Sequence, residues 1–389
     1  MTRKNKLILP ILLASATLTV MAGAIISPVQ NHMREGLGID PSYVGTIITT
    51  HGLSMAFCSL FMGSIIDRAG VRLPYIAGLL IFGISGGAGL VLDSYSSLII
   101  SRVFMGMALA GIFTCINVII LNTYDDKKRD RIMGWRGSAQ ALGGIMWPPL
   151  GGFLGDISWH LPFSIYLVAI PIGLAAMTVV KDTAPQINNA IKHETNTSIF
   201  SIMKSNPVIF VIFGLMFFSS FQLYAVVIYI PQLLEVFGVS SSLRISTFIT
   251  TMATGAALMS FVYGKIRGKF SYRIISLAGV TAWAVVFFVI ARAQSQLTVM
   301  LSVFFLGTGQ GLIMPTVMVW IGKVVPPSFR GRFSSYLGIF TYIGQFLSPI
   351  LLAPALIHLG IRGVFGVSSL IGVIWFIILL SLVRKKETA

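Results

Sequence analysis

The sequence has few charged residues. Of its 389 residues only 10% are Asp, Glu, Lys or Arg, against about 25% in an ordinary soluble domain. Hydrophobic residues make up 55% of the chain. Because a large share of any soluble protein's surface is polar, a water-soluble fold of this size could not cover so much apolar material. The composition therefore excludes a soluble enzyme, a secreted disulfide scaffold and a disordered chain, and it predicts a polytopic membrane protein.

Catalytic and metal-binding motifs are also missing. The two cysteines, Cys58 and Cys115, lie inside apolar runs without the spacing of a disulfide framework or a metal site. The sequence contains no Gly-x-x-x-x-Gly-Lys-Ser/Thr loop for ATP and no His-Glu-x-x-His metal motif. No nucleophile and base stand together at one depth. We therefore expect no cofactor, no metal ion and no enzymatic activity.

Apolar segments of the length that crosses a bilayer, about 20 residues, recur along the chain. They predict twelve transmembrane helices joined by short outer loops, except for a longer outer loop over residues 29–42. The first segment follows basic residues but is too long for the apolar core of a signal peptide, so we expect it to be retained. The predicted spans are 7–28, 43–66, 73–92, 97–122, 133–155, 162–180, 206–230, 244–266, 273–293, 296–322, 333–358 and 362–383.

The basic residues are distributed unevenly between the two sides of this topology. Lys and Arg number 28 and Asp and Glu 12, which gives a net charge of +16. With the N-terminus in the cytoplasm, nearly all Lys and Arg fall on the cytoplasmic side, as the positive-inside rule requires. Both termini are therefore predicted to be cytoplasmic, and the charge is explained without nucleic acid as a partner. The exceptions are Arg102 inside a span and Arg34, Arg244, Arg292 and Arg362 on the outside.

The chain divides into two similar halves. A polar cytoplasmic segment, 181–205, separates a predicted bundle of six helices over 1–180 from a second bundle of six over 206–389. One constant shift of 201 residues aligns the halves and places Gly63 on Gly264, Gly106 on Gly307 and Gly143 on Gly344. Parallel repeats of this kind place a substrate site between the halves near the membrane midplane. The repeat therefore predicts a transporter that works by alternating access.

The loop between spans 2 and 3, GSIIDRAGVR at residues 63–72, resembles the cytoplasmic loop signature of the major facilitator superfamily. In that family the loop is a latch that stabilises the outward-facing state. The resemblance implies this role for Gly63, Asp67, Arg68, Gly70 and Arg72. An ordinary positive-inside loop is the alternative.

Span 4 contains Arg102 followed four residues later by Gly106, which resembles the basic motif of the same family. The resemblance implies that Arg102 takes part in proton transfer or organises the cavity. A charge inside a span is costly and is by default a functional candidate. The alternative is an arginine whose side chain reaches the outer headgroups.

Span 5 contains GGIMWPPLGG at residues 143–152, which resembles the antiporter motif of the family's drug-exporting branch. Gly143, Pro148, Gly151 and Gly152 match the motif, whereas Trp147 stands where it has a second glycine. The resemblance implies a bent helix that seals one face of an exporter. A generic proline kink is the alternative.

No acidic residue lies at mid-depth in any predicted span. Cavity carboxylates are what attract cationic compounds, so we expect a neutral, zwitterionic or anionic substrate, with Arg102 available to an anion. Proton coupling then needs another titratable group, and His51 in span 2 is the best candidate, although it could also be a structural histidine between helices.

Polar and aromatic residues in the spans are candidates for substrate binding, although such residues also commonly join helices in lipid. They are Asn117, Gln140, Gln222, Tyr224, Tyr229, Gln310, Trp320 and Gln345.

The sequence thus predicts an all-α membrane protein with the major facilitator fold. The predicted function is a secondary active transporter, a monomer that spans the bacterial cell membrane many times. We expect it to export a small amphipathic organic compound in exchange for protons. The alternatives are a proton-coupled uptake carrier for a small organic anion and a lipid-handling flippase on the same fold.

Overall fold

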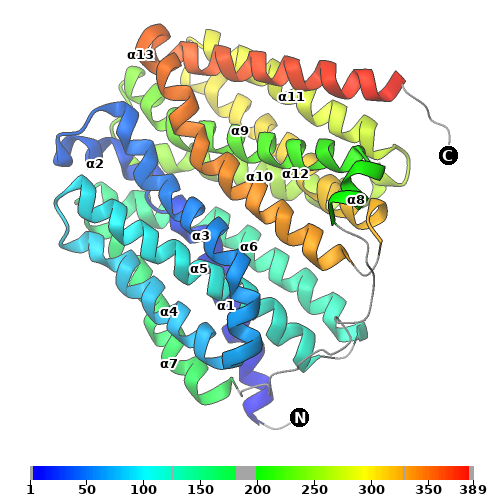
Figure 1. Cartoon of the computed structure of the whole chain (residues 1–389). Helices are drawn as coiled ribbons and strands as arrows, with labels where there is room; N and C mark the ends of the chain where they lie inside the picture. The colour runs from blue at the N-terminus through cyan, green and yellow to red at the C-terminus, as the bar shows by residue number, and fades with distance from the viewer. Residues whose placement is uncertain (1–2, 125, 181–198, 327–328, 385–389) are drawn as a thin grey trace. The chain divides into compact units, whose positions relative to one another are not determined.

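The computed structural model describes residues 3–124, 126–180, 199–326 and 329–384, and these residues are almost entirely helical (Figure 1). The chain separates into two compact units, which we call the first unit (Met1–Ser198) and the second unit (Ile199–Ala389). The division falls within the predicted linker 181–205, of which residues 181–198 lie outside the described part.

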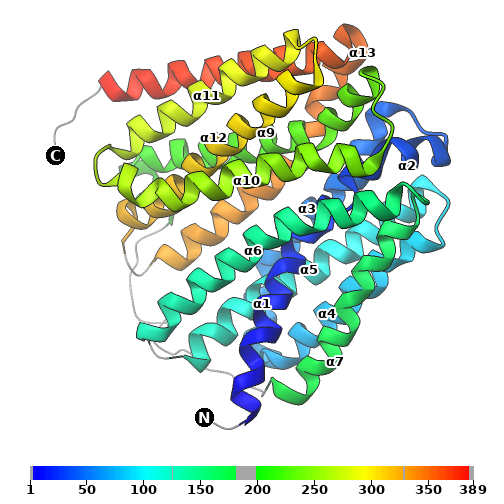
Figure 2. The ribbon, with the colours of Figure 1, turned by 180° about the vertical axis from the view of Figure 1, so that it is seen from behind.

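The first unit begins with α1 (Arg3–Ala24), which is followed by a 3-10 turn and a short helix. Its elements are α1, η1 (Ser27–Val29), α2 (Gln30–Leu37), α3 (Pro41–Ala69), α4 (Arg72–Gly87), η2 (Ala88–Leu90), α5 (Tyr95–Thr123), α6 (Asp126–Gly155), η3 (Leu161–Val168) and α7 (Ala169–Val179). Helix α4 lies beside α7, and Figure 2 shows α6 running beside α1.

The second unit consists of one short helix followed by longer ones. Its elements are α8 (Ile199–Ser205), α9 (Val208–Val236), α10 (Ser242–Arg267), α11 (Tyr272–Arg292), α12 (Gln296–Val324) and α13 (Arg330–Arg384). The φ angle of Gly360 is 69°, and this left-handed residue divides α13 into two helical pieces.

The start of several helices follows from the sequence, and the starts repeat between the units. The side chain of Asp40 accepts a hydrogen bond from a backbone N–H at the beginning of α3, and Ser241 does so at the beginning of α10. Ser94 and Ser295 cap α5 and α12 in the same way. Asp and Ser are preferred at this position because their oxygens satisfy N–H groups that have no partner within the helix. The caps obey the same shift as the internal repeat.

One pair of repeated glycines, Gly106 and Gly307, marks equivalent close contacts between helices. A Cβ at Gly106 of α5 would lie 2.1 Å from the carbonyl oxygen of His51 on α3. A Cβ at Gly307 of α12 would lie 2.0 Å from the carbonyl oxygen of Met252 on α10. Only glycine permits backbones to approach so closely. The repeat seen in the sequence therefore also appears in the way the helices pack.

The number of candidate spans differs from the sequence prediction. In the described part of the chain, ten helices are long and apolar enough to cross a membrane, against twelve predicted spans. Helix α6 is not among them, since it opens with a run of charged residues, and α13 contains two predicted spans, 333–358 and 362–383. The predicted outer loop over 29–42 is wrong in detail, because η1 and α2 continue the helical path as far as Leu37.

Candidate functional site

Arg102 lies on α5 with its side chain fully buried. Its guanidinium carbon is 5.1 Å from the centroid of the Phe163 ring and 5.3 Å from that of Tyr166. Nη2 donates to the carbonyl oxygen of Gly86 at 3.4 Å, and Nη1 lies 3.1 Å from the sulfur of Met105. An arginine reaching the headgroups would be exposed, so the structure does not support that alternative.

The two aromatic rings reach Arg102 because η3 packs tightly against α4 and η2. A Cβ at Gly86 would lie 2.6 Å from the Tyr166 side chain, and a Cβ at Gly89 would lie 2.0 Å from the Phe163 ring. The hydroxyl of Tyr166 donates to the carbonyl oxygen of Ala22 on α1 at 2.7 Å. Side chains and backbone from α4, α5 and η3 therefore surround one guanidinium, and α1 holds the Tyr166 hydroxyl. We call Arg102, Gly86, Phe163 and Tyr166 the arginine cage.

The contacts of the arginine cage are neutral. Among the residues that the structure describes, no acidic side chain forms an ion pair with Arg102. Rings attract a cation through their negative faces, but they do not cancel its charge. A buried and uncompensated guanidinium is costly unless an anionic partner or a change of state uses it. Within the described part of the chain, the cage therefore holds a buried positive charge that no acidic side chain balances.

His51 lies on the helix that packs directly against the helix of Arg102. Its side chain is buried in α3, and its carbonyl oxygen faces Gly106, one turn beyond Arg102 on α5. The structure thus brings together the two segments that carry the residues predicted to couple transport to protons.

Arg136 of α6 is a second buried arginine, and the sequence analysis missed it. Its Nη1 donates to the side-chain oxygen of Asn117 on α5, and its guanidinium lies 4.5 Å from the centroid of the Phe113 ring. Its position inside the predicted span 133–155 was the signal that could have identified it.

Gln140 lies one turn beyond Arg136, and its Nε2 donates to Thr19 Oγ1 on α1 at 2.8 Å. The two predicted substrate-binding residues of the first unit thus lie near the buried Arg136: Asn117 of α5 accepts its hydrogen bond, and Gln140 lies one turn further along α6. Both polar groups also join helices, which was the alternative for residues of this kind.

In the second unit, the predicted substrate-binding residues of α9 contact α13. Gln222 donates to the carbonyl oxygen of Ser368 at 2.7 Å. The hydroxyl of Tyr229 donates to the carbonyl oxygen of Pro349 at 3.2 Å. Tyr224 is half-buried on the same helix. In the described structure Gln222 and Tyr229 hold α9 to α13.

The remaining candidates lie on α12 and α13. Gln310 accepts a hydrogen bond from the hydroxyl of Ser219 at 2.9 Å. Trp320 stacks on Tyr272, with ring centroids 5.8 Å apart, and Gln345 is buried. Substrate binding by these residues stays a prediction.

Comparison with known proteins identifies the family. The sequence model of the Major Facilitator Superfamily matches residues 12–249 and 213–389. The chain belongs to the major facilitator superfamily. Its helical fold agrees with this membership, since solved transporters of low sequence identity superpose on it. They include a D-xylose-proton symporter (TM-score 0.78, 15% identity, 96% of each chain) and the nucleoside transporter NupG (TM-score 0.80, 14% identity, 95% of this chain and 98% of that one).

Drug-resistance proteins are among the major facilitator relatives. The chain is 24% identical to multidrug resistance protein 1 of Bacillus subtilis, with 90% of this chain and 89% of the relative covered. It is 24% identical to the quinolone resistance protein NorA of Staphylococcus aureus, with 94% and 93% covered. The chain is therefore similar to transporters along its whole length, and it is not an enzyme.

The major facilitator loop between α3 and α4 is partly engaged within the first unit. Arg72 Nη2 donates to the carbonyl oxygen of Met177 near the end of α7 at 2.9 Å. Gly70 has a φ angle of 76° and makes the turn. Asp67 and Arg68 are exposed, and in the described part of the chain neither forms an ion pair.

Two further features of this loop follow from its glycine and its charges. A Cβ at Gly63 would meet nothing within 4 Å, so this residue provides no close helix contact within the first unit. Since Asp67 and Arg68 remain exposed, they are available to a partner that appears in another conformation.

The antiporter-type motif forms the contact of α6 with α1. A Cβ at Gly143 would lie 3.0 Å from the carbonyl oxygen of Thr17, and one at Gly151 would lie 2.3 Å from that of Ile25. Trp147 donates to the same Thr17 carbonyl at 3.1 Å, so the residue that departs from the motif strengthens the contact. Pro148 lies within the helix and Gly152 is buried.

Proposed function

We propose that this major facilitator transporter exports a small amphipathic organic compound in exchange for protons. The observation that supports this best is its similarity to two bacterial drug-resistance proteins over at least nine-tenths of the chain. The antiporter-type contact between α6 and α1 supports the same branch of the family.

The proposed topology has twelve crossings, with both termini in the cytoplasm of a bacterial cell. Two bundles of six helices, 1–180 and 206–389, are joined by the cytoplasmic linker 181–205. Counting α6 and the two pieces of α13 as separate crossings accounts for twelve. We propose that the protein works as a monomer in the cell membrane.

The proposed substrate is neutral, zwitterionic or anionic. The acidic residues that the structure describes sit in turns or near helix ends, whereas Arg102 and Arg136 are buried. A carboxylate on the substrate would find charge-assisted donors there, while a simple organic cation would not. The name of NorA points to quinolones, which carry a carboxyl group, and we propose compounds of that type as the first to test.

Purified protein in liposomes with an imposed pH gradient tests the direction of transport. Exchange predicts that a zwitterionic quinolone moves against the proton flow and that a protonophore abolishes this movement. Movement in the same direction as the protons would refute export and favour the uptake carrier of small organic anions, which the arginine cage also fits. Empty liposomes and a lipid-scrambling assay are the controls, since scrambling would indicate a flippase.

A further inference from the structure

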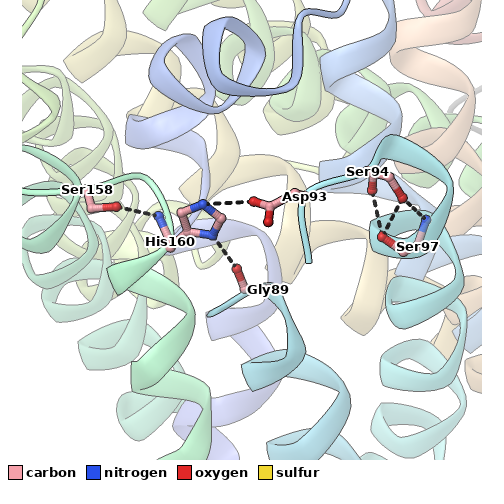
Figure 3. Close-up of polar contacts among 6 residues, drawn as sticks. All are labelled: Gly89, Asp93, Ser94, Ser97, Ser158 and His160. Atoms are coloured by element: carbon pink, nitrogen blue, oxygen red, sulfur yellow. Dashed lines mark hydrogen bonds and ion pairs between the residues drawn. The ribbon is translucent and has the colours of Figure 1, made fainter. Parts of the chain in front are cut away.

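His160 lies in the turn between α6 and η3, beyond the arginine cage. Figure 3 shows its imidazole between two acceptors of the segment that joins α4 to α5. Nδ1 is 3.0 Å from the carbonyl oxygen of Gly89, and Nε2 is 3.2 Å from the carboxylate of Asp93. We call Gly89, Asp93 and His160 the clasp.

The geometry of the clasp fixes how many protons it holds. A carbonyl oxygen can only accept, so Nδ1 must carry a proton. Nε2 faces a carboxylate, and this contact is attractive only if one more proton lies on the ring or on Asp93. Without that proton, a nitrogen lone pair faces a negative oxygen. The contact between His160 and Asp93 is therefore attractive when the clasp holds one exchangeable proton and repulsive when that proton is absent.

The clasp is accessible to the solution. The side chain of Asp93 is 78% exposed and that of His160 is 26% exposed, so the proton can exchange with solvent. Exposure also weakens the attraction of an ion pair, which leaves the contact reversible. Histidine is the side chain that ordinarily changes charge between about pH 5 and 8.

His160 also supports its neighbours by packing. The ring of Trp159 stacks on it, with centroids 3.6 Å apart and an angle of 30° between the planes. Gly36 of α2 lies so close to Trp159 that a Cβ there would be 2.3 Å from the indole nitrogen. The clasp thus joins the segment before α5 to the segment before η3, and Trp159 extends this packing to α2.

Other charged groups lie on these segments. Asp156 stands in the same turn as His160, Arg34 and Glu35 form a 3.7 Å ion pair on α2, and Arg102 lies beneath η3. Asp93 is the acid that faces the imidazole, so its carboxylate determines whether the charged ring is favoured.

Gly89 of the clasp contacts a residue of the arginine cage. The backbone of Gly89 accepts the hydrogen bond of His160 and also supports the ring of Phe163, which covers Arg102. His160 immediately precedes η3, the segment that supplies Phe163 and Tyr166. A change at His160 is therefore transmitted through η3 to the cage.

We propose that the clasp is a proton-dependent device that positions η3 over Arg102. With its proton bound, the clasp holds the start of η3 against Gly89, and when the proton is lost this end of η3 is released. His160 is a positioning residue in this scheme. The link to exchange rests on the proposed function, whereas the clasp itself does not.

Spin labels on the two exposed turns test the clasp without any transport. The labels replace Val91 and Ile157 in full-length protein from which Cys58 and Cys115 have been removed by substitution with alanine. In lipid nanodiscs we expect a narrow distance distribution at about pH 5 and a broad one at about pH 8, because the contact of Nε2 with the carboxylate is attractive only when the clasp holds its proton.

Two variants and one control make this test specific. His160→Gln and Asp93→Asn replace a titrating group by an amide, so the distribution should no longer change with pH. His358→Gln, an exposed histidine of the second unit, should leave the change intact. The proposal is refuted if the unsubstituted protein shows the same distribution at both pH values, or if either clasp variant still responds.

Exchange measured in liposomes tests the link to the arginine cage. The ratio of exchange rates at acidic and alkaline pH on the clasp side should fall towards one in His160→Gln and Asp93→Asn. An unchanged ratio in variants that have lost the label response would refute the positioning of Arg102. Failure of the protein to exchange any probe would refute the proposed function, while the label experiment would still decide on the clasp.

Discussion

Replacing Arg102 by methionine tests whether this arginine serves transport or the stability of the fold. The change removes two ring contacts worth about 1–2 kcal/mol each in a desolvated site. The hydrogen bonds to Gly86 and Met105 are long or involve sulfur, so together they contribute no more than about 1 kcal/mol. Against this, placing an arginine within a span costs about 3 kcal/mol. The favourable and unfavourable contributions nearly cancel.

We therefore expect Arg102→Met to change the free energy of unfolding by no more than about 2 kcal/mol, a shift of a few degrees in Tm. The repeat supports this expectation, because Val303 occupies the equivalent position in the second unit and is fully buried. Proton-coupled exchange should nevertheless be abolished, since the buried positive charge is gone.

The measurements are thermal unfolding in detergent and exchange in liposomes. Arg292→Met is the matched control, because Arg292 also lies over an aromatic ring, that of Phe288 at 5.5 Å, but is exposed. It should retain both stability and exchange. A loss of more than about 3 kcal/mol in Arg102→Met, typical of a broken buried network, would show that the arginine is structural. A normal pH response of exchange in this variant would refute its role in coupling.

Five other substitutions, of which Gly63→Ala is a control, test the remaining assignments. Asp67→Asn should lower turnover several-fold and leave substrate affinity unchanged, because the loop biases conformations without touching substrate; parallel binding and flux measurements decide this. His51→Ala should flatten the pH profile of exchange between about pH 5 and 8, and an unchanged profile would exclude His51 as the coupling group. Gly106→Ala should destabilise the fold by about 1–3 kcal/mol in thermal unfolding because its Cβ meets a backbone oxygen, whereas Gly63→Ala, which meets open space, should be nearly neutral. Asp40→Ala should remove a helix cap worth about 1 kcal/mol. Hydrogen bonds from Ser42 hold the pKa of the Asp40 carboxyl below its usual value, so this difference from wild type should be present at neutral pH and vanish as the pH falls below about 4.

Much of the fold could be predicted because lipid imposes simple rules. A helix that crosses the bilayer must be long and apolar, so the positions of most helices follow from the apolar segments. The alignment of Gly106 with Gly307 predicted a repeat, and the structure shows the same contact with a backbone carbonyl at both places. The bounds of helix α6 were harder to predict, because Arg136 and the charged residues before it resemble a polar loop.

The candidate site could be predicted only in part. Arg102 is visible in the sequence because a charge in a span is rare. Phe163 and Tyr166 are not, since aromatic residues are common throughout an apolar chain and nothing local distinguishes two that surround a cation. The clasp was missed for a related reason. His160 and Asp93 lie in separate turns, and only the packing of η3 against α4 brings them together.

The left-handed turn at Gly360 has a consequence for the end of the chain. A continuous helix of the 55 residues in α13 would be about 80 Å long, far more than the roughly 30 Å of a bilayer core. Figure 1 shows the chain reversing its direction in α13 instead. A single residue therefore decides whether the number of membrane crossings is odd or even, and so on which side the last residues emerge. A substitution that made residue 360 helical would place the C-terminal end of α13 on the other side of the membrane. A C-terminal tag that a protease can cleave from one side only would report this change.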